Sequence, residues 1–169
     1  AGPLHGLANE MVLRWIQDVM NKMDNKVPTK DEMAKFVEDT LDSGQVVPGF
    51  GHAVLRKTDP RYQAQREFCL EYLPDDPIFQ YVDLLFQVTP PILDRYGKAK
   101  NPWPNVDAGS GALLYHFGLT EFPYYTVLFA VSRVMGMMSQ LVINRGIGAS
   151  ITRPKSVTTN WIKKTVGAS

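Results

Sequence analysis

The segment Pro48 to Arg61 concentrates residue types that bind anions, since it holds one histidine, three cations and two glycines. Gly49 and Gly51 carry no Cβ, so a ligand can approach the backbone closely. Arginines bind carboxylates and phosphates through paired hydrogen bonds, and His52 can donate to a carbonyl oxygen. The segment predicts a site for an anionic small molecule, although a structural histidine that bonds nearby backbone is an equally good interpretation of His52 alone.

Two further segments add candidate groups. Lys98 to Asp107 ends in an aspartate where a helix is expected to begin. Asp107 could be an N-cap, or it could be a general base, because apolar neighbours such as Trp103 solvate a carboxylate poorly and raise its basicity. The segment Gly2 to Asn9 carries His5 just before another helix, where it could cap that helix or belong to a site. These residues alone leave both alternatives open.

The elements that must position these groups are helices, and the chain is predicted to be all-α. Thr29 and Glu32 form a capping box, and Asp59 and Asp76 each precede a proline, which is typical of a helix start. Apolar residues at helical spacing and terminal glycines predict helices over about 9–23, 29–43, 60–73, 77–96, 108–117 and 123–145, with Pro90 and Pro91 expected to kink or interrupt the fourth. Loops are expected at 46–58, 97–107 and 146–160, and only Gln45–Val47 is strand-like.

Composition excludes several classes of protein. The formal net charge of the 169 residues is +1, and the basic residues form no stripe, so nucleic-acid binding is not expected. The single cysteine, Cys69, cannot form an internal disulfide, and we interpret it as a small buried hydrophobe. No cluster has metal-ligand spacing, so no metal is predicted.

The run Tyr124 to Ile143 is apolar and long enough to span a membrane, but Arg133 lies in its middle. A central arginine costs about 2.5–3.5 kcal/mol on insertion scales. We therefore predict no membrane span, but a helix buried within a soluble protein, where Arg133 needs an anionic partner.

Three motifs, Gly-Pro-Leu-His-Gly, Pro-Gly-Phe-Gly-His and Pro-Asn-Val-Asp, together resemble the carboxy-terminal part of citrate synthase of the mitochondrial type. The resemblance runs from His5 to about Ser156. It implies an acyltransferase of the citrate (Si)-synthase type in the mitochondrial matrix. That enzyme condenses acetyl-CoA with oxaloacetate through an enol, with coenzyme A as substrate and product and no permanently bound cofactor.

The resemblance also assigns catalytic roles. Asp107 would take a proton from the methyl group of acetyl-CoA, while neutral His5 donates a hydrogen bond to the thioester carbonyl oxygen. His52 would polarise the ketone of oxaloacetate. Arg61 and Arg133 would hold the oxaloacetate carboxylates.

The remaining assignments concern the partner subunit and coenzyme A. Arg153 would reach the site of a second subunit, which implies a homodimer, and Phe129 would line the substrate cavity, although core packing explains Phe129 equally well. The residues expected to bind coenzyme A are Val46, Val47, Gly49, Gly51, Arg56 and Asn105. Taken singly, each arginine could instead form a surface ion pair.

The chain departs from the family pattern in three respects. Gly109 stands where the family usually has histidine, and Phe50 stands where it usually has tyrosine. A further oxaloacetate-binding histidine and most of the large helical domain have no counterpart here. The resemblance implies a small domain over 1–113 and the carboxy-terminal part of the large domain over 114–169, and we expect the isolated chain to be inactive.

Two alternatives to this function remain. One is 2-methylcitrate synthase, because one extra methyl group changes pocket fit by only about 1–3 kcal/mol. The other is a non-catalytic structural relative, or a partial subunit, of the same fold. The chain could accordingly be a fragment or a split subunit that works with a missing amino-terminal half.

Overall fold

A computed structural model describes residues 7–97, 99–150 and 157–167. These residues form seven helices and no strand, which confirms the all-α prediction. The helices are α1 (Ala8–Lys22), α2 (Lys30–Asp42), α3 (Pro60–Tyr72), α4 (Pro77–Tyr96), α5 (Asp107–His116), α6 (Pro123–Gly146) and α7 (Thr159–Val166). The first six begin and end within about a residue of the predicted positions. The strand-like stretch Gln45–Val47 is irregular backbone.

Helix starts are set by the side chains that the sequence indicated. The Thr29 hydroxyl accepts a hydrogen bond from the Glu32 N–H at 3.3 Å, and the Glu32 carboxylate accepts from the Thr29 N–H at 2.8 Å. Asp59 and Asp76 cap α3 and α4, and a proline follows each of them. These caps satisfy backbone donors that have no partner inside the helix.

Helix α4 runs unbroken from Pro77 to Tyr96, so of the two effects predicted for Pro90 and Pro91, a kink or an interruption, the interruption was wrong. Two consecutive prolines remove two backbone donors from the helix. Burial on the same helix offsets that cost, because Val88, Thr89, Pro90 and Ile92 are all buried. Packing of this segment therefore outweighs its local preference.

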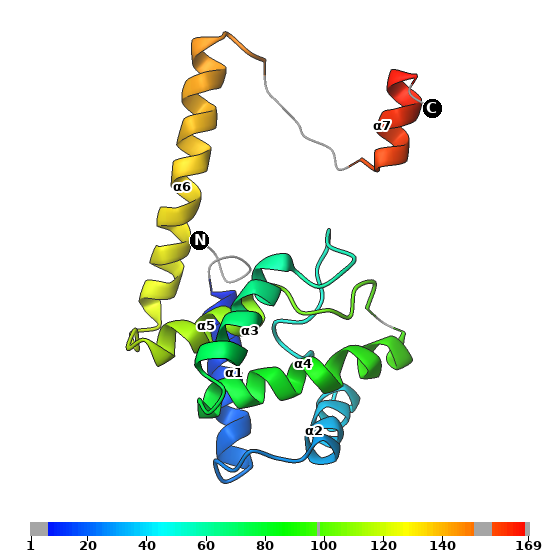
Figure 1. The fold of residues 1–169 in the computed structure, drawn as a ribbon, viewed down its shortest axis with the longest axis vertical. Helices are drawn as coiled ribbons and strands as arrows, with labels where there is room; N and C mark the ends of the chain where they lie inside the picture. The colour runs from blue at the N-terminus through cyan, green and yellow to red at the C-terminus, as the bar shows by residue number, and fades with distance from the viewer. Residues whose placement is uncertain (1–6, 98, 151–156, 168–169) are drawn as a thin grey trace. The chain divides into compact units, whose positions relative to one another are not determined.

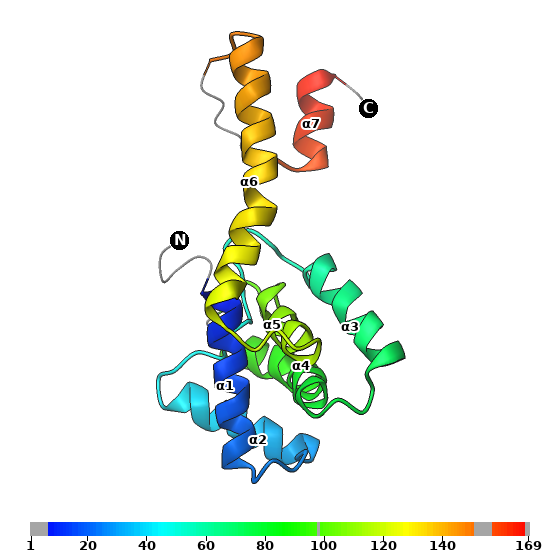
Figure 2. The same ribbon diagram turned by 90° about the vertical axis from the view of Figure 1, so that its left-hand side faces the viewer.

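Residues up to Val131 form one compact unit. In it α4 contacts α1, α2 and α5, and α5 also contacts α1 and α3. Figure 1 and Figure 2 both show α1, α4 and α5 side by side. The core of this unit is drawn mainly from α1, α2 and α4, and its most buried side chains include Ile16, Met33, Val37, Tyr81 and Leu85.

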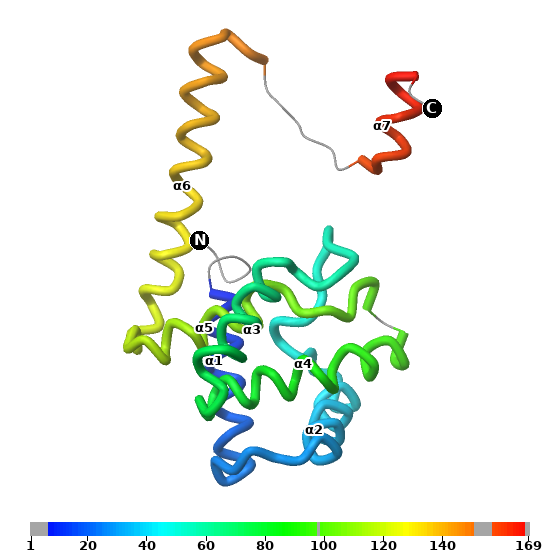
Figure 3. Tube along the Cα trace, viewed as in Figure 1, coloured from blue at the N-terminus to red at the C-terminus, as the bar shows by residue number. Residues whose placement is uncertain are grey.

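Residues from Ser132 onward form a second compact unit, which contains the later part of α6 and the helix α7. Helix α7, near the C-terminus of the tube in Figure 3, was not predicted. Thr158 caps it by accepting from the Trp161 N–H at 3.1 Å, and Gly167 ends it in the left-handed conformation. Both end signals are visible in the sequence, but the eight residues between them are too few for a clear apolar stripe.

Helix α6 is apolar but exposed within this chain, because Tyr125 is its only buried residue in the part that the structure describes. An 18-residue stretch of α6 has a mean hydropathy of 1.6, and the helix is long enough to cross a membrane, although core helices of soluble proteins often pass the same test. The predicted burial of this helix is therefore not provided by the described residues.

Candidate functional site

The site is built on two loops that pair through their backbones. Phe50 and Pro104 form an isolated antiparallel bridge. The Gly51 N–H donates to the Trp103 carbonyl at 3.0 Å, and the Asn105 N–H donates to the Gly49 carbonyl at 2.9 Å. The glycine-rich and proline-rich motifs, about fifty residues apart in sequence, thus meet in space.

Glycine is required at position 49 for two reasons. Its φ is +83°, a conformation that L side chains rarely adopt. A Cβ there would lie 2.8 Å from Cα and 2.9 Å from Cβ of Ala108, in the first turn of α5. The absent side chain therefore lets the loop pack directly against the helix that carries Asp107.

Asn105 cross-links the two loops with both ends of its side chain. Its Nδ2 donates to the Gly51 carbonyl at 3.0 Å, and its Oδ1 accepts from the Asp107 N–H at 3.0 Å. The residue predicted to bind coenzyme A therefore also fixes the backbone from which Asp107 projects.

Asp107 is the first residue of α5, but its side chain does not cap the helix. The N-cap is Val106, which makes no side-chain capping bond, so the structure does not support the N-cap alternative for Asp107. Burial raises the pKa of the Asp107 carboxyl, while the charge of Arg61 partly opposes that rise and the charge of Asp59 adds to it. A half-buried carboxylate with a raised pKa is a stronger base than an exposed one.

His52 lies in the exposed part of the glycine-rich loop, and its ring is held in one tautomer. Its Nδ1 accepts from the Val54 N–H at 2.9 Å and from the Leu55 N–H at 3.0 Å. A ring nitrogen that accepts carries no proton, so the proton of the neutral ring is on Nε2. His52 therefore bonds nearby backbone and can also donate a hydrogen bond from Nε2, which combines the two interpretations of its sequence position.

Arg61 lies at the start of α3 and pairs with Asp59. Its Nη2 donates to Asp59 Oδ2 at 2.7 Å and its Nε donates to Asp59 Oδ1 at 3.0 Å. The Arg61 side chain is 61% exposed, whereas that of Asp59 is 1% exposed. Arg61 is thus anchored on one edge of its guanidinium and remains accessible. The Asp59 carboxylate was recognised from sequence only as a helix cap.

The predicted coenzyme A segment borders a hollow of about 250 Å³ on the first unit. Val46 is 77% exposed at this hollow and Val47 is 3% exposed. The lining residues are mostly apolar: Leu41, Gly44, Gln45, Val46, Val47, Phe50, Leu93, Tyr96 and Ala99. Arg56 is folded back on the neighbouring loop, where its Nη1 donates to the carbonyls of Ala53 and Leu55 at 3.1 and 2.8 Å.

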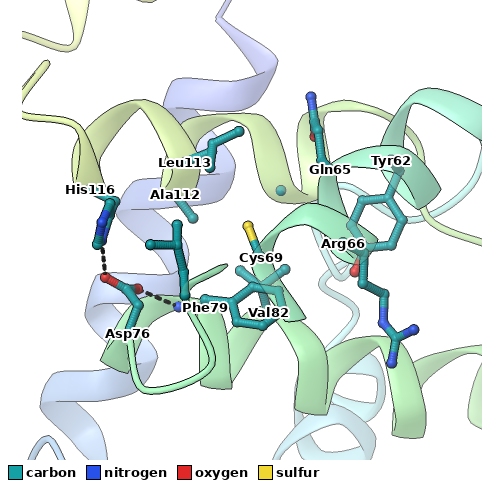
Figure 4. A pocket seen from close by; sticks show the side chains of 12 residues that line it. Tyr62, Gln65, Arg66, Cys69, Asp76, Phe79, Val82, Ala112, Leu113 and His116 are labelled. Carbon is teal, nitrogen blue, oxygen red and sulfur yellow. Dashed lines mark hydrogen bonds and ion pairs between the residues drawn. The ribbon is translucent and has the colours of Figure 1, made fainter. Parts of the chain in front are cut away.

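A second, smaller cavity lies between α3, α4 and α5 (Figure 4). Its free space of about 10 Å³ could hold about one water molecule. Cys69 lines it, and burial raises the pKa of this thiol to about 11. His116 lies at the rim, where its Nδ1 is 2.6 Å from Asp76 Oδ2. Both residues occupy structural positions.

The remaining predicted residues are His5, Phe129, Arg133 and Arg153. His5 and Arg153 lie outside the described residues. Phe129 and Arg133 both belong to α6, and Arg133 is in the second unit. Among the described residues, no group of three or more histidine, cysteine, aspartate or glutamate side chains could hold a metal ion.

The fold and the site define a class of protein: a helical scaffold whose paired loops carry a basic carboxylate, a neutral histidine donor and an accessible arginine. Such a set can remove a proton from carbon next to a carbonyl while an anion is held nearby. The chain belongs to the citrate synthase family, because residues 1–155 match the family model of the citrate synthase C-terminal domain.

Named relatives agree with this assignment. Mitochondrial citrate synthase of Citrus maxima is 61% identical over 97% of this chain and 35% of its own length. Mitochondrial 2-methylcitrate synthase of Yarrowia lipolytica is 55% identical over 99% of this chain and 36% of its own length. The chain therefore spans about a third of the length of the relatives that it matches.

Solved structures share the fold. Citrate synthase of Thermotoga maritima matches with a TM-score of 0.68 and 28% identity, over 94% of this chain and 40% of that one. Citrate synthase of Thermoplasma acidophilum matches with a TM-score of 0.67 and 24% identity over the same shares, and its structure is a ternary complex with carboxymethyl coenzyme A and oxaloacetate.

Proposed function

We propose that this chain is the carboxy-terminal catalytic part of a citrate synthase, which condenses acetyl-CoA with oxaloacetate. The observation that carries the proposal is the Asp107 carboxylate. Burial raises its pKa, and no described side chain hydrogen-bonds to it. It is therefore a base whose lone pairs are available to a substrate.

Different residues act on the two substrates. Asp107 takes a proton from the methyl carbon of acetyl-CoA and His5 gives a proton to the thioester oxygen, so that the thioester becomes an enol. The Nε2–H of His52 donates to the ketone oxygen of oxaloacetate, which makes the ketone carbon more electrophilic. The enol carbon then bonds to that carbon, while the enol oxygen returns its proton to His5 and the ketone oxygen takes the Nε2 proton of His52. Water then cleaves the thioester of citryl-CoA, which releases citrate and coenzyme A.

Arg61 binds one oxaloacetate carboxylate. Its bonds to Asp59 use the Nε hydrogen and one Nη2 hydrogen. A guanidinium has five N–H donors, so its Nη1 edge remains to form a paired interaction with a carboxylate. The same pairing with Asp59 orients the group before substrate arrives, which lowers the entropy lost on binding.

Coenzyme A binds at the hollow beside Val46 and Val47, whose apolar lining suits the flat face of an adenine ring. Arg56 contacts a phosphate of the same molecule. Its donors now satisfy carbonyls of its own exposed loop, so this contact requires the side chain to turn outward.

The remaining roles follow the family resemblance. His5 donates to the thioester carbonyl, Arg133 and the partner subunit's copy of Arg153 bind oxaloacetate, and Phe129 lines the cavity. A homodimer and an amino-terminal large domain complete the site, and residues 1–113 form the small domain. We place the enzyme in the mitochondrial matrix, because relatives of 57–61% identity carry the name mitochondrial citrate synthase.

A second candidate is 2-methylcitrate synthase, which the 55% identical relative from Yarrowia lipolytica favours. The assembled enzyme should be assayed for coenzyme A release with acetyl-CoA and with propionyl-CoA, each with and without oxaloacetate. Higher kcat/KM with acetyl-CoA supports citrate synthase, and higher kcat/KM with propionyl-CoA supports the alternative. No release at all would refute both and favour a non-catalytic relative. Release that does not depend on oxaloacetate would also refute both, because it indicates simple hydrolysis of the thioester.

A further inference from the structure

The Asp59 carboxylate makes more interactions than a helix cap requires. It is 1% exposed, and its Oδ1 accepts the capping hydrogen bond from the Arg61 N–H at 3.0 Å. Its Oδ2 accepts from Nη2 of Arg61 and, at 3.2 Å, from the N–H of Val106, the residue before Asp107. The Asp59 N–H donates to the Pro104 carbonyl at 3.2 Å. One residue therefore contacts both the arginine and the loop that ends at the carboxylate base.

We propose that Asp59 is a positioning residue, which holds the Arg61 guanidinium and the first residue of α5 in fixed relation. This inference rests on the proposed function, in which Arg61 binds oxaloacetate and Asp107 acts on acetyl-CoA. Neither substrate touches Asp59 in this scheme. Its effect on catalysis passes through the two groups that it holds.

The electrostatics of the cluster support this role. The hydrogen bond from the Arg61 side chain is the largest cause that lowers the pKa of Asp59, so Asp59 is ionised at neutral pH. The ionised side chains that act on Asp107 are those of Arg61 and Asp59. Removing the Asp59 charge would lower the pKa of Asp107 directly, and it would also leave the positive charge of Arg61 less compensated. Both effects act in the same direction.

The chain offers a matched control for the capping function. Asp76 also caps a helix that begins with proline, by accepting from the Phe79 N–H at 2.8 Å. Its second carboxylate oxygen is bound by His116, which is not part of the proposed catalytic cluster. Asp59→Asn and Asp76→Asn therefore make the same chemical change at two equivalent helix starts, and only the first alters contacts with Arg61 and Val106.

The test measures oxaloacetate kinetics and pH profiles of the assembled enzyme. In Asp59→Asn the new amide presents a donor where Arg61 and Val106 also donate, so we expect kcat/KM for oxaloacetate to fall about 10- to 100-fold. The acid limb of the profile should move to lower pH. Asp59→Glu keeps the negative charge but changes its position. Its kcat/KM for oxaloacetate should therefore fall, while the acid limb of its pH profile should stay where it is in the parent enzyme. Asp76→Asn should change kcat/KM less than threefold.

The inference is overturned if Asp59→Asn matches Asp76→Asn in kcat/KM, or if its acid limb does not move. A parent enzyme without condensation activity would refute the proposed function instead. In that case the titration of the Asp107 carboxyl carbon by NMR, assigned with Asp107→Asn, decides the inference separately. A lower midpoint in Asp59→Asn supports the inference, and an unchanged midpoint overturns it.

Discussion

Replacing Asp107 with asparagine should separate catalysis from folding. The side chains are nearly the same size, and no described side chain hydrogen-bonds to the carboxylate, so the substitution leaves its surroundings intact. What it removes is the ability to accept a proton. A positioned general base contributes about 10²–10⁴-fold to rate. At 1.36 kcal/mol per factor of ten, the barrier should rise by about 2.7–5.4 kcal/mol.

The same substitution should stabilise the folded protein at neutral pH. Burial raises the pKa of Asp107 above its unfolded value, so the folded state binds the proton more tightly. Stability from this group is therefore fully present below the unfolded pKa and is lost as pH rises through the folded pKa. An amide carries no charge to desolvate, so Asp107→Asn should unfold at a higher temperature than the parent at pH 7. This difference should vanish in acid.

Two measurements test the prediction. Coenzyme A release by the assembled enzyme can be followed with a thiol reagent. The one cysteine that this chain contributes adds little background, because it is 6% exposed and burial raises its pKa to about 11. Thermal unfolding at pH 7 and at pH 3 gives the stability difference. Turnover within tenfold of the parent would refute the role of Asp107 as the base. A lower unfolding temperature at pH 7 would refute the argument from burial.

Three further outcomes are expected. Arg56→Ala should raise KM for acetyl-CoA more than KM for oxaloacetate, and the defect should shrink in high salt, because a phosphate contact is screened; a change confined to oxaloacetate would contradict this. Gly49→Ala should lower the unfolding temperature more than Gly44→Ala, because both have φ near +80° but only Gly49 would place a Cβ against Ala108, and equal losses would count against that packing. The isolated chain should be inactive and self-associated by sedimentation, since α6 is apolar and exposed, and an active monodisperse monomer would contradict this.

Much of the fold could be predicted because the sequence marks its helix ends chemically. Asp59, Asp76 and Thr29 cap the helices that they were predicted to cap. The predicted interruption at Pro90 and Pro91 did not occur, because the rule that proline breaks a helix considers only the local backbone. It does not include the burial of the neighbouring side chains. Helix α7 was missed for a different reason: its two ends carry clear signals, but eight residues give little periodicity between them.

The candidate site was predicted in its parts but not in its connections. The segments that carry His52, Arg61 and Asp107 were singled out from residue types, and the resemblance gave those residues roles. The bond from Val106 to Asp59 joins residues 47 positions apart, and no local pattern in one sequence indicates it. Likewise, the engagement of Asn105 with Gly51 depends on how two irregular loops pair.

The three residues of the site are attached to the fold in different ways, and this bears on how each is positioned in the proposed reaction. Asp107 and Arg61 lie in the first turns of α5 and α3, which contact each other, and Asp59 hydrogen-bonds to the start of each helix. His52 is attached differently, because its ring nitrogen Nδ1 is hydrogen-bonded to the Val54 and Leu55 N–H groups of its own exposed loop. The distance between base and arginine can therefore stay fixed while His52 moves with that loop. For the proposed condensation, this arrangement keeps the carboxylate that accepts the proton at a fixed position relative to bound oxaloacetate. It also leaves the histidine donor free to align with the ketone oxygen.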